Sequence, residues 1–182
     1  LTPLCNLNCK MCYVHLTQEQ LQGHKLLSLD EWKSLIKQAD DLGMHKITLS
    51  GGECLTYPYF KELYSYIYSL GIETCVMTNG VLLDQYFDLF DSYPPKLVVV
   101  TLYGSDEEEY ESVTGSRAYQ RVMNNLMTLK EKKLQTHISI TPNAFMLDGM
   151  KLVDTVHNLG FNYKINANLI EPRIDTERKN VE

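Results

Sequence analysis

The chain has 182 residues, of which 44% are hydrophobic and 22% are charged, as in an ordinary globular domain. This composition excludes a disordered chain, a collagen and a small disulfide scaffold. With 23 acidic and 17 basic side chains, the formal net charge of −6 has the wrong sign for a non-specific nucleic-acid binder. No apolar run reaches the about 18 residues of a membrane-spanning helix. We therefore expect neither nucleic acid nor a membrane as partner.

Short β-branched runs alternate with amphipathic stretches along the chain. A first helix is expected after Ser28 or Asp30, with Trp32 and Ile36 on its inner face, and it should end near Gly43. Strands are predicted at residues 46–50, 72–78, 97–102, 136–141 and 161–169. Helices are predicted at residues 59–70, 81–90, 105–112, 118–133 and 147–159. Because parallel strands need long crossovers, this alternation predicts an α/β fold with a parallel sheet.

The five predicted strands become six if a shortened strand precedes Cys5. The pattern fits both an open doubly wound sheet and a partial (β/α) barrel, and in both the chemistry belongs at the carboxyl ends of the strands. No internal repeat, low-complexity stretch or Pro/Gly/Ser linker divides the sequence. We therefore expect one domain over residues 1–182.

Three of the five cysteines, Cys5, Cys9 and Cys12, fall on one short segment. Thiolates at this spacing suit a soft metal, either zinc or the iron of a sulfide cluster. His15 offers a fourth ligand, which would complete a structural Cys3His zinc site. If the three thiolates instead hold three irons of a [4Fe–4S] cluster, the fourth iron stays open to a small molecule, which is a catalytic arrangement.

A Ser-Gly-Gly-Glu turn at residues 50–53 follows the first complete predicted strand. Because Gly51 and Gly52 lack a Cβ, a ligand can approach their backbone closely. The Glu53 carboxylate can accept hydrogen bonds from an ammonium group. Since neighbouring parallel strands end at one rim, this turn should share its rim with the cysteine segment.

The cysteine spacing, followed by the Ser-Gly-Gly-Glu turn, resembles the radical S-adenosylmethionine (radical SAM) superfamily. The resemblance covers nearly the whole chain and implies a partial (β/α)6 TIM-like barrel of parallel strands, with its active site at their carboxyl ends. It implies that Cys5, Cys9 and Cys12 bind a [4Fe–4S] cluster, and that the amino and carboxylate groups of SAM chelate the open iron.

The resemblance also assigns residues to SAM. Gly51, Gly52 and Glu53 match the motif that receives the SAM amino group. Tyr13 matches an aromatic position whose backbone lies near the adenine. Thr78, Asn79 and Thr101 match strand-end positions that contact SAM. Arg121 is the candidate cation for the SAM carboxylate. Arg121 has the alternative interpretation of a solvated cation on an amphipathic helix.

The implied mechanism leaves bond breaking to the cofactor, while the protein binds and orients. One electron enters the reduced cluster, the sulfonium C–S bond breaks, and a 5′-deoxyadenosyl radical abstracts hydrogen from the substrate. A reducing partner such as flavodoxin or ferredoxin would supply the electron. Because thiols without a disulfide framework suit reducing conditions, we expect the cytoplasm as the compartment.

Three short phrases of the sequence resemble the corresponding segments of enzymes with a SPASM or twitch extension. They are Leu-Tyr-Gly at residues 102–104, Val-Thr-Gly at 113–115 and Glu-Pro-Arg at 171–173. Those enzymes commonly form thioether or C–C crosslinks in ribosomally made peptides (RiPP maturation), so a precursor peptide is the expected substrate. The alternatives are an oxidoreductase acting on a tetrapyrrole or other small metabolite, and a structural zinc domain. No cysteine follows Cys75, whereas SPASM proteins hold auxiliary [4Fe–4S] clusters beyond the barrel. We therefore expect the chain to be a slice of a longer protein, without that extension.

Simpler roles are expected for the remaining conspicuous residues. The acidic run at residues 107–109 should lie in the first turn of a helix, complement the helix dipole and face water. Cys75 should be a buried strand thiol, and Cys54 a packed residue near the SAM pocket.

Overall fold

The computed structural model of the protein describes residues 1–12, 25–146 and 148–166. Its five parallel strands form one sheet in the order β1-β2-β3-β4-β5, so each strand lies beside the next one in the sequence. The strands are β1 (Lys46–Leu49), β2 (Glu73–Thr78), β3 (Leu97–Leu102), β4 (Thr136–Ile140) and β5 (Asn162–Ile165). The strand order never reverses and β5 does not pair with β1, which is the arrangement of a partial barrel rather than of a doubly wound sheet.

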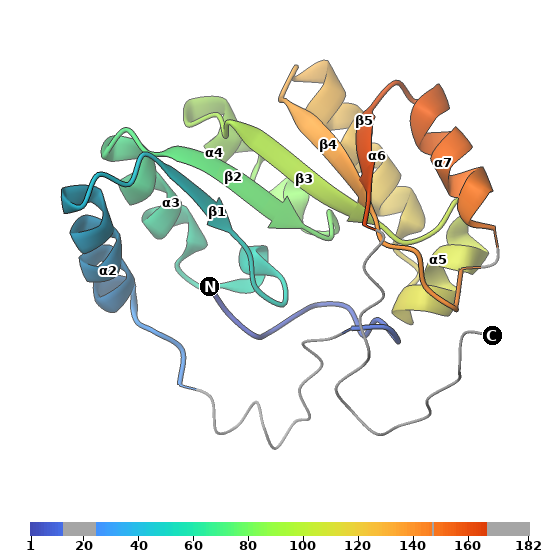
Figure 1. Ribbon diagram of the computed structural model, residues 1–182, viewed down its shortest axis with the longest axis horizontal. Coiled ribbons are helices and arrows are strands. Elements are labelled where there is room, and N and C mark those ends of the chain that lie inside the picture. Colours follow the sequence, from blue (N-terminus) through green and yellow to red (C-terminus); the bar gives the residue numbers. More distant parts are fainter. Residues whose placement is uncertain (13–24, 147, 167–182) are drawn as a thin grey trace.

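The helices cover one face of this sheet (Figure 1). They are α2 (Leu29–Asp41), α3 (Phe60–Ser69), α4 (Phe87–Ser92), α5 (Glu107–Thr114), α6 (Tyr119–Glu131) and α7 (Gly149–Asn158). Alternation along β3 directs Val98, Val100 and Leu102 toward the helices, where all three are fully buried in the core. We call the opposite side of the sheet, which carries Met77 and Thr101, the open face.

Most predicted elements are confirmed, but the helix predicted over residues 81–90 is not continuous. A short 3₁₀ turn, η2 (Leu83–Gln85), precedes α4, and Tyr86 separates them in a non-helical conformation. The Tyr86 hydroxyl donates to the Leu55 carbonyl at 2.6 Å and its ring packs edge-on against Phe60. These tertiary contacts hold Tyr86 against the core at the break in the helix.

The sixth strand that the sequence predicts before Cys5 is not formed within the described residues. The first four residues instead run beside the turn after β1 through three backbone hydrogen bonds: Leu1 N–Ser50 O at 2.6 Å, Gly52 N–Thr2 O at 2.7 Å and Glu53 N–Leu4 O at 2.7 Å. From there the segment passes the carboxyl ends of the strands toward α5 (Figure 1). Of the predicted strand at 161–169, residues 167–169 lie outside the described part.

In the described parts of the chain, none of the helices combines the length and the apolar character needed to cross a membrane.

Candidate active site at the carboxyl ends of the strands

The Gly-Gly turn after β1 receives the chain's own N-terminal segment. A Cβ built on Gly52 would lie 2.5 Å from the Leu4 carbonyl oxygen, and one on Gly51 would overlap the Thr2 carbonyl oxygen. Real Cβ contacts are never this short, so both positions require glycine for this packing. These glycines thus allow the close approach of the N-terminal segment that leads into Cys5, in addition to any ligand.

The cysteine segment is then fastened to the last turn of α5. The Asn8 amide donates to the Thr114 carbonyl at 3.2 Å, and the Lys10 amide donates to the Val113 carbonyl at 3.0 Å. Gly115 ends α5 in the left-handed conformation with φ of 69°, and its amide closes the helix on Glu111. The Val-Thr-Gly phrase therefore positions the cysteine segment, a local structural role that needs no peptide substrate.

The three thiols of the segment lie close enough to interact electrostatically. Burial, together with the neighbouring Cys5 and Cys12 thiolates, raises the pKa of Cys9 to about 12. Cys5 is exposed, and its sulfur accepts hydrogen bonds from the Leu7 amide at 3.4 Å and the Asn79 side-chain amide at 3.7 Å. That these cysteines form one cluster of ligands stays a prediction from the sequence.

Two tyrosines that the sequence did not single out as site residues complete this environment. Tyr103 follows β3 directly, and its hydroxyl lowers the pKa of the Cys9 thiol, which opposes the effect of burial. Tyr110 on α5 packs edge-on against the Tyr103 ring with the centroids 6.2 Å apart, and its side chain is fully buried. A signal for Tyr103 was present, because the residue after a central parallel strand lies at the same rim as the turn after β1.

Glu53 joins the ends of β1 and β2. Its carboxylate, with the residue only 1% exposed, accepts from the Asn79 amide at 2.7 Å and from the Leu55 amide at 3.1 Å. Burial raises the pKa of Glu53, while these hydrogen bonds oppose the shift. The Asn79 side chain continues the connection, donating to the Asn6 side-chain oxygen at 2.8 Å. The strand-end turn and the cysteine segment are therefore one hydrogen-bonded unit.

Sequence comparison assigns the family. The family model described as the radical SAM superfamily matches residues 1–157, which is most of the chain. The chain belongs to the radical SAM superfamily. Among curated relatives, the GTP 3′,8-cyclase of Clostridium perfringens (strain SM101 / Type A) is 26% identical over 176 residues, covering 94% of this chain and 53% of the cyclase. The chain thus spans about half the length of that relative.

Solved structures share the fold. SuiB of Streptococcus suis bound to precursor peptide SuiA superposes with a TM-score of 0.75 at 19% identity, over 90% of this chain and 37% of SuiB. The structure of anSMEcpe with bound AdoMet superposes with a TM-score of 0.76 at 17% identity, over 98% of this chain and 50% of that chain. Both likenesses support the radical SAM partial barrel as the fold.

The donor set fits the iron–sulfur cluster that the radical SAM family implies. Within residues 1–12, 25–146 and 148–166, no three His, Cys, Asp or Glu side chains are placed to hold one metal ion. A [4Fe–4S] cluster does not require three ligands around one metal ion, because each thiolate binds a different iron. The buried Tyr110 hydroxyl, which has no hydrogen-bond partner in the described part of the chain, adds an unused donor beside the thiols. His15, the proposed zinc ligand, lies outside the described residues.

The other residues assigned to SAM have distinct environments. Thr78 and Asn79 are buried at the end of β2, where Thr78 accepts from the Gly80 amide at 3.0 Å and also contacts Glu53. Thr101 lies on the open face beside Ser139 of β4. The Arg121 guanidinium binds the Asp84 carboxylate at 2.8 Å with its side chain 46% exposed, which agrees with its alternative interpretation as a surface cation. Tyr13 lies outside the described residues.

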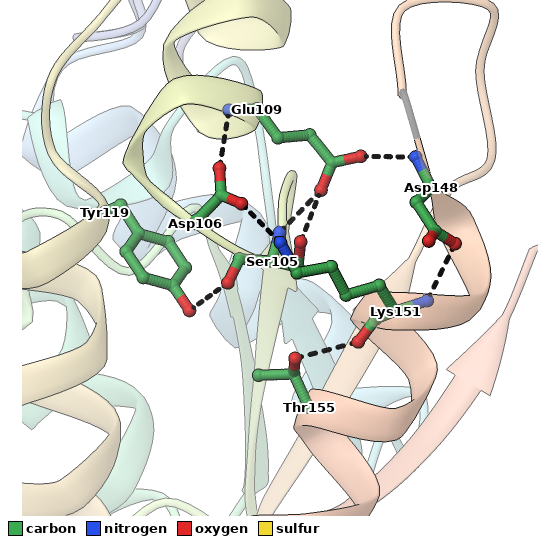
Figure 2. A network of polar contacts seen from close by, with 7 residues as sticks. All are labelled: Ser105, Asp106, Glu109, Tyr119, Asp148, Lys151 and Thr155. Atoms are coloured by element: carbon green, nitrogen blue, oxygen red, sulfur yellow. Dashed lines mark hydrogen bonds and ion pairs between the residues drawn. The ribbon is translucent and has the colours of Figure 1, made fainter.

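The acidic run on α5 corrects a sequence expectation. The expected location in the first helical turn is confirmed, but Glu109 is only 2% exposed instead of facing water. Its carboxylate accepts from the Ser105 amide at 2.7 Å and from the Asp148 amide at 3.0 Å (Figure 2). Lys151 on α7 binds Asp106, the N-cap of α5, at 2.6 Å. This network fixes α5, and with it the cysteine segment, to α7.

The remaining cysteines are packed, as the sequence predicts. Cys54 is fully buried, and its thiol donates to the Met77 carbonyl at 3.2 Å, next to Glu53. Cys75 is 6% exposed and lies beside Thr48 of the neighbouring strand β1.

Proposed function

We propose that this chain is the core of an enzyme that reductively cleaves SAM and uses the 5′-deoxyadenosyl radical to abstract hydrogen from a substrate. Cys5, Cys9 and Cys12 would hold the cluster. When bound, the cluster supplies the electron that breaks the C–S bond of SAM. The observation that carries this proposal is the convergence of three thiols at the carboxyl ends of β2 and β3, where the Asn79 side chain donates to the Cys5 sulfur at 3.7 Å and the Cys5 and Cys12 thiolates raise the pKa of Cys9.

The chain's own residues would bind and orient the reactants. The Glu53 carboxylate, which accepts the Leu55 and Asn79 amides and lies 3.7 Å from the Cys54 thiol, would also receive the SAM amino group. Gly51 and Gly52 keep this turn free of side chains. On the open face, Thr101 and the 39%-exposed Met77 would lie along the bound SAM and substrate. The exposed Cys5 marks the side from which flavodoxin or ferredoxin would deliver the electron.

Mutation of each loop cysteine tests this activity. In the full-length protein, reconstituted anaerobically with iron and sulfide, Cys5→Ala, Cys9→Ala or Cys12→Ala should abolish formation of 5′-deoxyadenosine from SAM, because two thiolates cannot hold the cluster in place. Cys75→Ala is the matched control, since its thiol lies in β2, and it should retain activity. Full SAM cleavage in any loop variant contradicts the assignment.

For the substrate, we propose a ribosomally made precursor peptide. Support comes from the shared fold of SuiB, whose structure contains precursor peptide SuiA, and from the Leu-Tyr-Gly and Val-Thr-Gly phrases. The support from the phrases is reduced because Tyr103 and Val113 already serve the cysteine segment. A purine nucleotide is the second candidate, favoured by the 26% identity to GTP 3′,8-cyclase.

Mass spectrometry distinguishes the two substrates. The full-length enzyme is incubated with SAM, a reductant and either the short peptide encoded beside it or GTP. Loss of two hydrogen atoms from the peptide per crosslink supports the peptide. An unchanged peptide together with SAM-dependent conversion of GTP decides for the nucleotide.

We propose further that residues 1–182 form the core domain of a longer cytoplasmic enzyme, whose extension carries auxiliary clusters. Iron well above about four atoms per full-length chain would support the auxiliary clusters. An iron content of about four would contradict them.

A further inference from the structure

Tyr110 occupies an unusual position in the aromatic group beside the thiols. Its ring lies between Tyr103 and Tyr119, with centroid distances of 6.2 Å to each. Both neighbouring hydroxyls have a partner to act on: Tyr119 donates to the Ser105 carbonyl at 2.7 Å, and the Tyr103 hydroxyl lowers the pKa of the Cys9 thiol. Only the central tyrosine of the three lacks a partner in the described part of the chain.

An unpaired hydroxyl in this position requires an explanation. Tyr110 is fully buried, so water does not reach its oxygen, and a buried donor without an acceptor destabilises the fold. Phenylalanine would fill the same space without this cost. The hydroxyl is therefore best explained by an acceptor that is present only in the loaded protein.

The charges around Tyr110 indicate where that acceptor lies. After burial, the largest influences that raise the pKa of the Tyr110 hydroxyl are the negative charges of the Cys9 and Cys5 thiolates. The backbone places the same helix beside these cysteines, because Val113 and Thr114 of α5 bind the amides of Lys10 and Asn8, which flank Cys9.

We propose that the Tyr110 hydroxyl donates a hydrogen bond to a sulfur of the [4Fe–4S] cluster, either a cysteine thiolate or a sulfide, and thereby raises the reduction potential of the cluster. This inference rests on the proposed function. A donor to sulfur stabilises the reduced cluster more than the oxidised one, because the reduced cluster carries one more negative charge. Tyr110 would make the cluster easier to reduce, and it would take no proton or electron itself.

A redox titration followed by electron paramagnetic resonance tests the proposal. Full-length parent, Tyr110→Phe and Tyr119→Phe proteins are reconstituted anaerobically, and the reduced cluster is quantified against the applied potential. Tyr119→Phe is the matched control, because it removes a hydroxyl of the same aromatic group that bonds Ser105 instead of sulfur. At a fixed potential, Tyr110→Phe should lower the ratio of reduced to oxidised cluster about tenfold, which equals about 59 mV for a one-electron couple. Tyr119→Phe should leave the ratio unchanged.

The stability of the cluster-free protein gives a second, independent readout. Without the cluster, Tyr110→Phe should unfold at an equal or higher denaturant concentration than the parent, because it removes an unpaired buried hydroxyl. A clear loss of stability in the cluster-free variant means that the hydroxyl has a partner in the protein, and this overturns the proposal.

The remaining outcomes are also decisive. An unchanged potential in Tyr110→Phe with full iron content overturns the inference and leaves the proposed function intact, whereas a parent that binds no cluster removes the proposed function itself. Loss of iron in Tyr110→Phe alone, with the fold retained by circular dichroism, supports a hydroxyl in contact with the cluster. Equal iron loss in Tyr119→Phe attributes the effect to ring packing and overturns it.

Discussion

At the residue scale, Glu53 links the turn after β1 to the end of β2. The resemblance to radical SAM enzymes implies that Glu53 binds the SAM amino group. In the structure its carboxylate also accepts from the backbone amides at the start of η1 (Cys54–Thr56) and at the end of β2. Both amides are buried from water by the surrounding turn. A residue that looks purely functional in the sequence therefore also supports the geometry of the strand ends.

We predict that Glu53→Ala destabilises the cluster-free protein by about 1–3 kcal/mol, because the amides of Leu55 and Asn79 lose their acceptor in a buried site. Glu53→Gln, which keeps one acceptor oxygen, should lose less. Urea denaturation measures the free energy of unfolding, with the exposed Glu131→Ala as control. A Glu53→Ala protein as stable as the Glu131→Ala control is incompatible with this connecting role.

The residue scale is also where sequence reasoning was least complete. Cys5, Cys9 and Cys12 were predictable because their spacing is local and their chemistry is specific. Tyr103 and Tyr110 were not, because an aromatic side chain after a strand or inside a helix is usually core. The burial of Glu109 was missed for a related reason: its partner Asp148 is 39 residues away, and only the packing of α7 beside α5 brings them together.

At the scale of elements, the cysteine segment is held from two sides. The turn after β1 binds its leading residues, and the last turn of α5 binds Asn8 and Lys10 on either side of Cys9. The strands and most helices were predictable, since short β-branched runs alternate with amphipathic stretches along the sequence. The break between η2 and α4 was not, because it depends on the tertiary contacts of Tyr86.

Gly52→Ala tests the first of these attachments. The new methyl group would lie 2.5 Å from the Pro3 and Leu4 carbonyl oxygens, so the segment that carries Cys5 must move. We expect less than half of the parent's iron after reconstitution, measured by colorimetric iron analysis. Gly149→Ala is the control, because its Cβ meets no atom within 4 Å, and it should bind iron like the parent. If Gly52→Ala binds as much iron as the parent, the packing argument is wrong.

On the scale of the whole molecule, the sheet has one covered and one open face. Helices bury Val76, Val100 and Ile138 completely, whereas Met77 on the open face and Ile165 of β5 stay 39% and 46% exposed. The sequence pattern predicted this α/β alternation without distinguishing a partial barrel from a doubly wound sheet, and the resemblance to radical SAM enzymes implied the partial barrel. The sequential strand order made that distinction, because it depends on which strands pair.

The central claim is that Cys5, Cys9 and Cys12 together hold one [4Fe–4S] cluster at the carboxyl ends of the strands. The most direct test is the iron content of the full-length protein, reconstituted anaerobically, compared with the variant in which all three cysteines are alanine. The parent should be brown, absorb near 400 nm and contain about four more irons per chain than the variant. Equal iron in the two proteins, or one colourless zinc per chain in the parent, would contradict the assignment.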